Sequence, residues 1–134
     1  MRVWLYENAE FTDPGDHYGF VYLITNLTNG RKYIGRKFFT KAKTTQSKGK
    51  KKKSRVHSGW DDYWGSNTEL LADVETLGKE NFKREILRLC KTRAECSYYE
   101  TKMIFEVDAL LKEEFYNAWV SAKIRSAHLK HLFS

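Results

Sequence analysis

The stretch from Gly19 to Ile34 constrains the fold of this chain more than any other segment, because it has the pattern of two short strands joined by a turn. Its first part, GFVYLIT, is rich in aromatic and β-branched residues, and its second part, RKYI, is a shorter strand-like run. The residues between them, NLTNG, end in the Asn-Gly pair typical of hairpin turns. The sequence therefore predicts a β-hairpin with Tyr22 on one strand and Tyr33 on the other.

The register of this hairpin decides where the two tyrosines point, because side chains alternate between the faces of a strand. If Thr25 lies opposite Gly30 around a four-residue loop, Tyr22 lies directly opposite Tyr33 and both phenols share one face. A register shifted by one residue would place the phenols on opposite faces. The sequence leaves both arrangements open.

Two helices and a third strand are expected after the hairpin. Ser66 or Asn67 can cap a helix over 68–77 that Gly78 would end, and FKREILRL over 82–89 has the pattern of a strand. A capping box from Thr92 to Glu95 predicts a second helix over 93–111. Five residues at helical spacing would form its buried stripe, namely Cys96, Tyr99, Met103, Val107 and Leu110.

Both ends of the chain are expected to add to this core. Residues 1–18, with a turn at Pro14-Gly15, suggest a short strand or arm followed by a loop. Residues 118–132 predict a last amphipathic helix that packs through Trp119, Val120, Ile124 and Leu132. Since the sequence contains neither an internal repeat nor a linker, residues 1–134 are expected to form a single domain with its core at 19–117.

The composition indicates a globular protein rather than a disordered or membrane one. Hydrophobic residues make up 41% of the 134 residues and aromatic residues 15%, which is enough to build a core. No apolar run reaches the about 18 residues of a membrane span, and residues 1–10 lack a signal-peptide pattern, so we expect a cytoplasmic protein. Cys90 and Cys96 fit neither a disulfide framework nor a zinc site, and we expect them to be reduced.

Positive charge is concentrated in one segment of the chain. Ten of the 24 lysines and arginines lie from Arg36 to Arg55 without an acidic residue among them, and the other 14 face 17 acidic residues, which leaves the rest at −3. A block of like charges repels itself, so we expect residues 40–55 to form an extended, mobile loop that suits a polyanion. The plainer alternative is a solvated basic run or a nuclear-targeting signal.

The segments FVYLITN and KYIG resemble the two signature strands of the GIY-YIG nuclease family, with FVY at 20–22 and YIG at 33–35. The following order of helix, strand and helix also resembles that family, as do Glu100 four residues before Ile104 and the pair Tyr116-Asn117. The resemblance covers residues 19–117. It implies an α+β fold with a small three-stranded antiparallel sheet flanked by helices, to which residues 118–132 would add a C-terminal helix.

By this resemblance the chain is a metal-dependent endonuclease that hydrolyses phosphodiester bonds in double-stranded DNA. Free-standing members of this kind often come from phages or mobile elements, and such a protein would work in the cytoplasm of an infected bacterium. The resemblance implies Tyr22 as general base or proton relay, Tyr33 as the group that orients water or phosphate, and Glu100 as the ligand of Mg²⁺ or Mn²⁺. It also implies that Asn117 positions Glu100 or the phosphate.

These residue types suit the chemistry. A hard cation such as Mg²⁺ takes one or two carboxylates together with waters and phosphate oxygens, so Glu100 alone can supply the protein ligand. A phenol with its pKa near 10 is a poor base unless its anion is stabilised. We therefore expect the neighbouring positive charge to serve both substrate attraction and activation of the phenol.

The sequence departs from the family pattern in two places. The leading glycine is displaced to Gly19, and no arginine occurs between Arg36 and Arg55, where the family carries its catalytic arginine on a first helix. We expect Arg55 to be the phosphate clamp with His57 beside the same phosphate, and Lys37 is the competing candidate, although lysine binds phosphate only as a point charge. The expected DNA-binding residues are Arg36, Lys41, Lys43, Lys50, Lys51, Lys52 and Lys53.

Two other classes of function stay open at this point. A nucleic-acid-binding module without hydrolysis would need only the lysines, and its binding would be salt-sensitive and independent of metal. A basic structural protein of a ribosome or phage particle would keep the tyrosines in its core. The sequence fixes neither the cleavage sequence, nor the number of strands cut, nor the oligomeric state, for which a monomer is the simplest expectation.

Overall fold

Five strands form one mixed sheet in the computed structural model, which describes residues 3–121 and 123–132. Across the sheet they are β2 (Ala9–Phe11), β1 (Trp4–Tyr6), β7 (Phe82–Cys90), β3 (Gly19–Asn26) and β4 (Lys32–Phe38). The predicted α+β class is confirmed, but a three-stranded antiparallel sheet is too small. β1 pairs in parallel with β7, more than 70 residues away in the chain, and brings β2 with it as a further antiparallel strand.

The predicted hairpin forms from β3 and β4, in neither of the two registers considered from the sequence but two residues away from the one with a four-residue loop. Thr25 pairs with Lys32 rather than Gly30, because the Asn26 side chain accepts hydrogen bonds from the Thr28 N–H and hydroxyl and bends the chain there. A shift of two residues preserves the faces. Tyr33 lies opposite Ile24, so it shares a face with Tyr22, and the two ring centroids are 6.1 Å apart.

The first helix, α1 (Thr68–Leu77), has the predicted ends. Asn67 caps it by accepting a hydrogen bond from the Leu70 N–H at 2.9 Å, and Gly78 ends it with a φ of 91°. Two short 3-10 turns flank it, η1 (Trp60–Asp62) before it and η2 (Lys79–Asn81) after it. The two ends of α1 therefore follow from its local capping residues.

The second helix, α2 (Arg93–Glu106), begins as predicted and ends earlier. The Thr92 hydroxyl accepts the Glu95 N–H at 3.1 Å, as the capping box requires. The helix stops at Glu106 and is followed by the turn η3 (Ala109–Leu111), so Val107 and Leu110 are exposed instead of completing the buried stripe. Within the described residues, no helix is long and apolar enough to cross a membrane.

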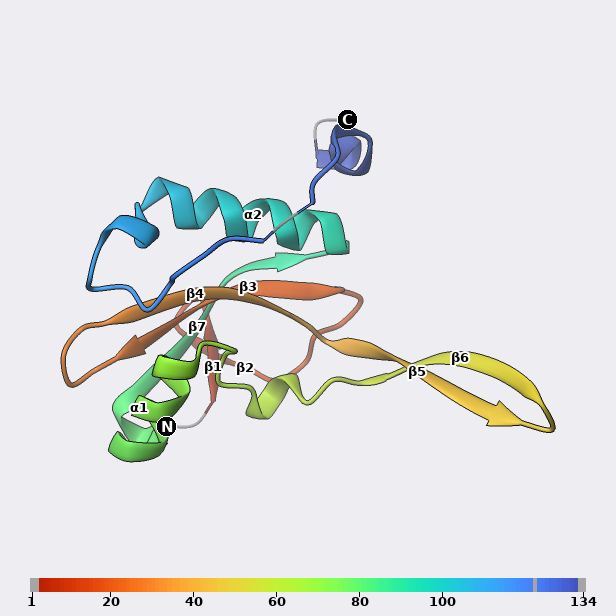
Figure 1. Ribbon diagram of the computed structural model, residues 1–134, viewed down its shortest axis with the longest axis horizontal. Coiled ribbons are helices and arrows are strands. Elements are labelled where there is room, and N and C mark those ends of the chain that lie inside the picture. The colour runs from red at the N-terminus through yellow and green to blue at the C-terminus, as the bar shows by residue number, and fades with distance from the viewer. Residues whose placement is uncertain (1–2, 122, 133–134) are drawn as a thin grey trace.

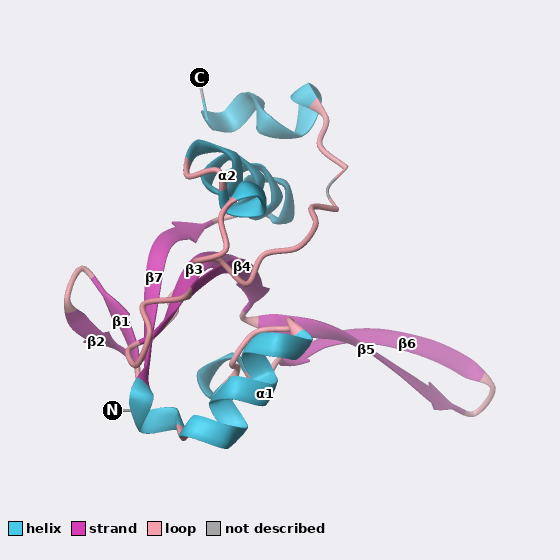
Figure 2. Cartoon of the chain, turned by 60° about the vertical axis from the view of Figure 1, so that its left-hand side comes forward, coloured by secondary structure: helices cyan, strands magenta, loops and turns pink. Residues whose placement is uncertain are grey.

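Helices cover the two faces of the sheet, α2 on one and α1 with η1 on the other (Figures 1 and 2). Because side chains alternate along β3, Phe20, Tyr22 and Ile24 join the α1 side, and Val21 joins the α2 side. The α1-side cluster also contains Trp4, Phe39, Trp60, Trp64, Leu70, Val74, Phe82, Ile86 and Tyr116. Cys90 and Cys96 are buried in the other cluster and unbridged, as expected.

The basic segment is a regular two-stranded ribbon, not the expected loop. β5 (Thr40–Ser47) and β6 (Lys50–His57) pair only with each other and project from the body of the molecule (Figure 1). In this register each basic residue lies opposite a neutral one, for example Lys43 opposite Ser54 and Lys52 opposite Thr45. Like charges directly opposite each other would destabilise a strand pair, so this alternation lets a highly charged sequence form a ribbon.

The C-terminal part does not form the predicted helix over 118–132. Residues 114–116 run beside β4 instead, where Lys32 donates its N–H to Glu114 at 2.8 Å and accepts the Tyr116 N–H at 2.7 Å. Residues 118–121 and 123–125 are not helical, and only the 3-10 turn η4 (Ser126–Leu132) follows. The pairing with β4 holds the chain extended before the amphipathic run begins, and it leaves the Trp119 side chain exposed.

Candidate active site

A cavity of about 330 Å³ opens at the β4 edge of the sheet. Four of the residues expected at the site line it, namely Tyr33, Arg36, Glu100 and Asn117. The remaining wall comes from Ile34, Ser66, Asn67, Ile104 and the segment from Ala118 to Ser121. β4, the start of α1, the middle of α2 and the C-terminal segment thus meet at one place.

The cavity wraps around the edge of β4. Tyr33 points to the α1 side of the sheet, and Arg36 points to the α2 side, where Glu100 lies. Both sides are reachable at this point because β4 is the last strand of the sheet. Tyr22 and Glu100 therefore approach from opposite faces and come near each other only around this edge.

Tyr22 lies behind the cavity wall, against the backbone of Gly35. Its side chain is buried, and a Cβ placed on Gly35 would clash with the Tyr22 hydroxyl. Gly65, at a φ of 95°, is the second glycine against this ring, since its Cβ would lie 3.6 Å from the same hydroxyl. The glycine of the YIG segment thus leaves the room that the Tyr22 hydroxyl needs.

Both phenols are held in the neutral state. Burial raises the pKa of Tyr22 well above its usual value, and the nearby oxygens of Tyr63, Tyr33 and Glu100 raise it further. Burial also raises the pKa of Tyr33, although its contact with the Ser66 hydroxyl at 3.4 Å opposes this. The lysines at 41–53 lie on the ribbon, which projects from the body of the molecule (Figure 1), and no lysine is among the groups that shift the pKa of Tyr22.

Glu100 is the acidic group of the cavity. Burial raises its pKa, and the ion pair with the Arg36 guanidinium opposes that shift. Among the residues that the structure describes, no group of three His, Cys, Asp or Glu side chains gathers to hold a metal ion. A single half-buried carboxylate in a polar cavity nevertheless fits Mg²⁺, which completes its shell with waters and phosphate oxygens.

Asn117 uses its amide to hold the C-terminal segment to β4. It donates to the Ile34 carbonyl at 2.8 Å and accepts the Ile34 N–H at 3.0 Å. These two bonds continue the pairing that begins at Lys32 and stop where the cavity opens. The oxygen and the nitrogen of the Asn117 side chain are therefore both hydrogen-bonded to Ile34, at the wall of the cavity.

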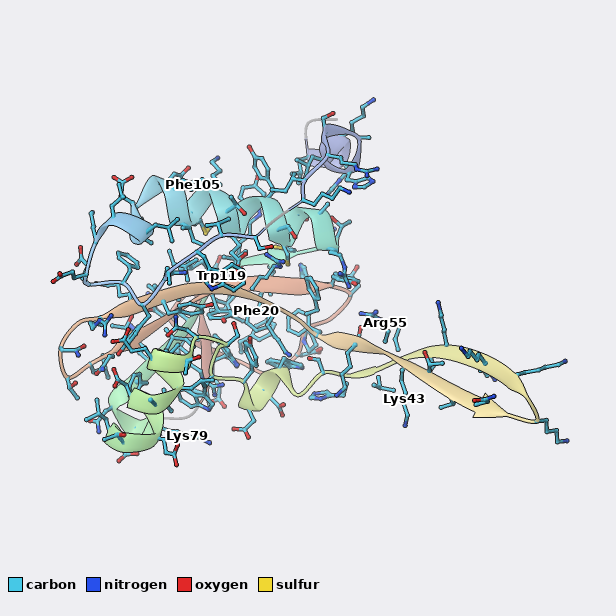
Figure 3. The ribbon with its side chains drawn as sticks, viewed as in Figure 1. Phe20, Lys43, Arg55, Lys79, Phe105 and Trp119 are labelled. Carbon is cyan, nitrogen blue, oxygen red and sulfur yellow. The ribbon has the colours of Figure 1, made fainter. Side chains whose placement is uncertain are left out.

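Arg55 and His57 do not line this cavity. The Arg55 guanidinium donates to the Thr40 carbonyl at 2.9 Å and to the Tyr18 hydroxyl at 3.4 Å, which fixes it at the root of the ribbon (Figure 3). His57 accepts the Gly59 N–H at 2.9 Å and borders a separate cavity beside Trp60. Neither residue lies beside Glu100 as the sequence analysis expected for a phosphate clamp.

Lys37 lies on β4 on the same face as Tyr33, with its ammonium 4.3 Å from the centre of the Tyr63 ring. Burial lowers its pKa, and Lys41 lowers it further. Lys37 therefore stands near Tyr22 through the shared neighbour Tyr63, outside the cavity that holds Glu100. The expected DNA-binding lysines all lie on the ribbon.

Sequence reasoning missed the partnership between Arg36 and Glu100, since it assigned Arg36 to DNA binding alone. Strand alternation contained the signal, because Arg36 shares a face with the apolar Ile34, which packs toward α2. Tyr63, whose ring centroid lies 6.0 Å from that of Tyr22, is not among the residues that the sequence indicated for the site. No local pattern indicates that contact, because it joins two segments 41 residues apart.

The two strands FVY and YIG side by side, with a glutamate at the sheet edge, define a GIY-YIG type of domain. A family model described as "Putative endonuclease segE, GIY-YIG domain" matches residues 4–120, and the chain belongs to this family. A protein of phage T4 with the description "Putative endonuclease segE" is 32% identical over 100 residues, 75% of this chain. The match spans only 40% of that relative's length. No solved structure matches the chain.

Proposed function

We propose that this chain is an endonuclease domain that hydrolyses phosphodiester bonds of double-stranded DNA at the β4-edge cavity, with Mg²⁺ or Mn²⁺. The observation that carries the proposal is the meeting of Tyr33, Arg36 and Glu100 in one cavity with Tyr22 behind it, in a member of this family. The net charge of +7 and the basic ribbon suit a DNA substrate. As a relative of a phage protein, the domain would work in the cytoplasm of an infected cell.

Arg36 is the phosphate clamp in this proposal, in place of Arg55. Phosphodiester cleavage requires that charge building on the phosphoryl oxygens be neutralised, and a guanidinium can bind two of them at once. Arg36 lines the cavity, whereas the Arg55 guanidinium is occupied by Thr40 and Tyr18. On substrate binding, Arg36 would turn part of its hydrogen bonding from Glu100 to the phosphate.

Glu100 is the residue that would hold the divalent cation, which supplies charge neutralisation at the phosphate and acidifies bound water. Burial keeps the Glu100 carboxylate in a poorly hydrated place, where an opposite charge is especially favourable. In the free protein, the Arg36 guanidinium supplies this opposite charge. The pair therefore keeps the carboxylate oriented until substrate arrives.

The two phenols act as hydrogen-bonding groups in this proposal. With a pKa raised by burial, Tyr22 is a neutral hydroxyl at neutral pH, and it serves as a proton relay that passes a proton while it accepts another. Tyr33 lies at the cavity wall, where its hydroxyl can orient the attacking water or the phosphate. Asn117 is a positioning residue that holds the wall in place.

The test is nicking of a supercoiled plasmid by the purified chain with Mg²⁺, with Mn²⁺ and with a chelator. Glu100→Gln should lower the nicking rate by about 100-fold or more while the melting temperature stays close to that of the parent. The matched control is Glu106→Gln at the exposed end of the same helix, which should nick normally. Undiminished nicking by Glu100→Gln would contradict the proposal.

A non-catalytic nucleic-acid-binding module is the second candidate. It is favoured by the neutral phenols and by the pairing of Glu100 with Arg36, which together describe a stable resting arrangement. This candidate predicts binding without metal, no nicking, and no effect of Tyr22→Phe on affinity. A purely structural role would keep both tyrosines in the core. Tyr22 lies there, whereas Tyr33 packs against the core and also lines the cavity with Glu100.

A further inference from the structure

We propose that the β5–β6 ribbon enters the major groove of the duplex whose strand is cut at the β4-edge cavity. This inference rests on the proposed function for the identity of the duplex as substrate. It adds the element that binds the duplex, the groove that this element occupies and the face that meets the bases.

Cationic side chains on both faces are the first observation. The ribbon register places four lysines on one face, Lys41, Lys43, Lys50 and Lys52, and three basic residues on the other, Lys51, Lys53 and Arg55. The lysines are exposed and do not pack on the body, whereas the Arg55 guanidinium donates to the Tyr18 hydroxyl at the root of the ribbon. A surface that lies across the outside of DNA needs cations on one face only. Cations on both faces suit an element that has phosphates on either side, as in a groove.

The dimensions of the ribbon select the groove. Two paired strands are about 4.8 Å apart, and with their side chains they fit the major groove, about 12 Å wide, but not the minor groove, about 6 Å wide. Each strand has eight residues, which corresponds to a length of about 26 Å. That length is shorter than one helical turn of B-DNA, about 34 Å, so a ribbon of this size can follow the groove without leaving it.

A row of uncharged side chains identifies the face toward the bases. On the face with Lys51 and Lys53, β5 contributes Ala42, Thr44 and Gln46. A glutamine amide bonds adenine edges, a threonine hydroxyl bonds several bases, and an alanine methyl contacts the thymine methyl. The opposite face carries all the lysines of β5, which are long and flexible enough to bend past the edges of the ribbon to the phosphates along the groove walls. We therefore place the row from Ala42 to Gln46 on the floor of the groove.

The root of the ribbon fixes its direction relative to the cavity. Phe39, the single residue between β4 and β5, is buried between Phe20 and Trp60. Its N–H donates to the Tyr18 carbonyl at 3.0 Å, and its carbonyl accepts the Ser58 N–H at 3.1 Å. The ribbon thus continues the strand that carries Tyr33 and Arg36, and one duplex can contact both.

Binding is measured on the full chain in a chelator, by fluorescence anisotropy with a labelled mixed-sequence duplex of about 30 base pairs. Lys43→Ala with Lys52→Ala removes charge from one face, and Lys51→Ala with Lys53→Ala removes it from the other. Each pair should weaken binding about tenfold and lower the salt slope by about two. The matched control is Lys102→Ala with Lys112→Ala on the body, which should leave both quantities unchanged.

Groove occupancy is read from dimethyl sulfate methylation of guanine N7, which lies in the major groove. The parent chain should protect these atoms, and a minor-groove ligand such as netropsin should not displace it. In selection from a random duplex pool, Thr44→Ala with Gln46→Ala should lose the sequence preference of the parent. Displacement by netropsin, equal affinity for single-stranded DNA or RNA, or dependence on only one lysine face would overturn the inference.

These outcomes separate the ribbon from the cavity. A chain that binds duplex through both ribbon faces without ever nicking it would refute the proposed function and support this inference. A chain that nicks in a Glu100-dependent way, with full affinity in both ribbon variants, would do the reverse. Melting temperatures of the ribbon variants should match the parent, because these side chains do not pack on the body.

Discussion

β4 lines the β4-edge cavity and continues into the ribbon, yet the cavity and the ribbon are built in opposite ways. Four segments distant in sequence form the cavity, and buried contacts such as the Asn117 bonds to Ile34 fix their positions. The ribbon is a local hairpin without a core, and its own ladder and its alternation of lysine with neutral residues hold it together. Substitutions of the buried groups that hold the cavity together should therefore cost global stability, whereas substitutions in the ribbon should leave the global stability unchanged.

The largest effect is expected from Gly35→Ala, which tests whether close packing behind the cavity contributes to stability. The added methyl group meets the Tyr22 hydroxyl and the Tyr33 ring, and overpacking of this kind costs about 2–3 kcal/mol. Thermal unfolding should show the loss, and nicking should fall about 100-fold as the phenols shift. Adding Tyr22→Phe should recover part of the stability, since the hydroxyl is among the closest atoms. An unchanged melting temperature for Gly35→Ala would refute this account of Gly35.

Asn117→Ala comes next, because it removes two hydrogen bonds to a buried backbone. Leaving the Ile34 N–H and carbonyl without these partners should cost about 2 kcal/mol in the free energy of unfolding. Denaturant unfolding measures the change. Asn29→Ala is the control, since exposed Asn29 accepts only the Arg31 N–H and should cost under about 1 kcal/mol. Equal losses in the two variants would argue against the positioning role of Asn117.

Glu95 extends the comparison between the body and the ribbon to charged side chains. It is buried and paired with Arg88 in the body, whereas the lysines of the ribbon are exposed. Burial would raise the Glu95 pKa, but hydrogen bonds from the Lys91 N–H and Arg88 outweigh it, and His131 adds to them, so the pKa is lowered. A lowered pKa means stability that is present above the unfolded value, about 4.3, and is lost as pH falls through the folded value.

Glu95→Gln should therefore cost about 1–2 kcal/mol near neutral pH and almost nothing well below the folded pKa of Glu95. Melting temperatures of the parent and the variant across this range test the expectation. The control is Glu106→Gln, at an exposed pair with Lys102, which should cost under about 1 kcal/mol near neutral pH. A Glu95→Gln difference that persisted in acid would assign the effect to packing rather than to charge.

The smallest effect is expected from Thr45→Lys, which places a lysine directly opposite Lys52. Like charges across a strand pair should weaken the ribbon by under about 1 kcal/mol, and Thr45→Glu should strengthen it by a similar amount. Hydrogen exchange of the ribbon amides reports this change, while the global melting temperature stays constant. A fall in global stability would mean that the ribbon supports the body after all.

Much of the fold was predictable because its signals are local. Asn67 and Gly78 define the ends of α1, Thr92 starts α2, and the NLTNG turn gives the hairpin. The shared face of Tyr22 and Tyr33 was one of two arrangements that the sequence left open, and the structure shows it in a register two residues away from the one that was considered. The class of site followed from these elements and the family resemblance.

The rest depended on contacts between distant segments. The β1–β7 pairing and the run of residues 114–116 beside β4 have no signature in either partner alone. The ribbon was predicted to be a loop because runs of like charge usually do not form regular structure. The pairing of each basic residue with a neutral one, which allows the ribbon to form, is visible only once the strand register is known. The Arg36–Glu100 pair required the position of α2 on the sheet, which the hairpin does not specify.

Phe39 anchors the root of the ribbon to the body of the molecule. Its side chain is buried and both of its backbone groups are hydrogen-bonded, so the length of the ribbon determines how far its tip extends from the cavity. Under the two proposals above, this length is the distance between the DNA contacts and the scissile bond. Each residue added to both strands would extend the reach by about 3.3 Å, close to the rise of one base pair. Under the same proposals, lengthening or shortening the hairpin would change the distance between the DNA contacts of the ribbon and the cleavage position, while the residues of the cavity stay the same.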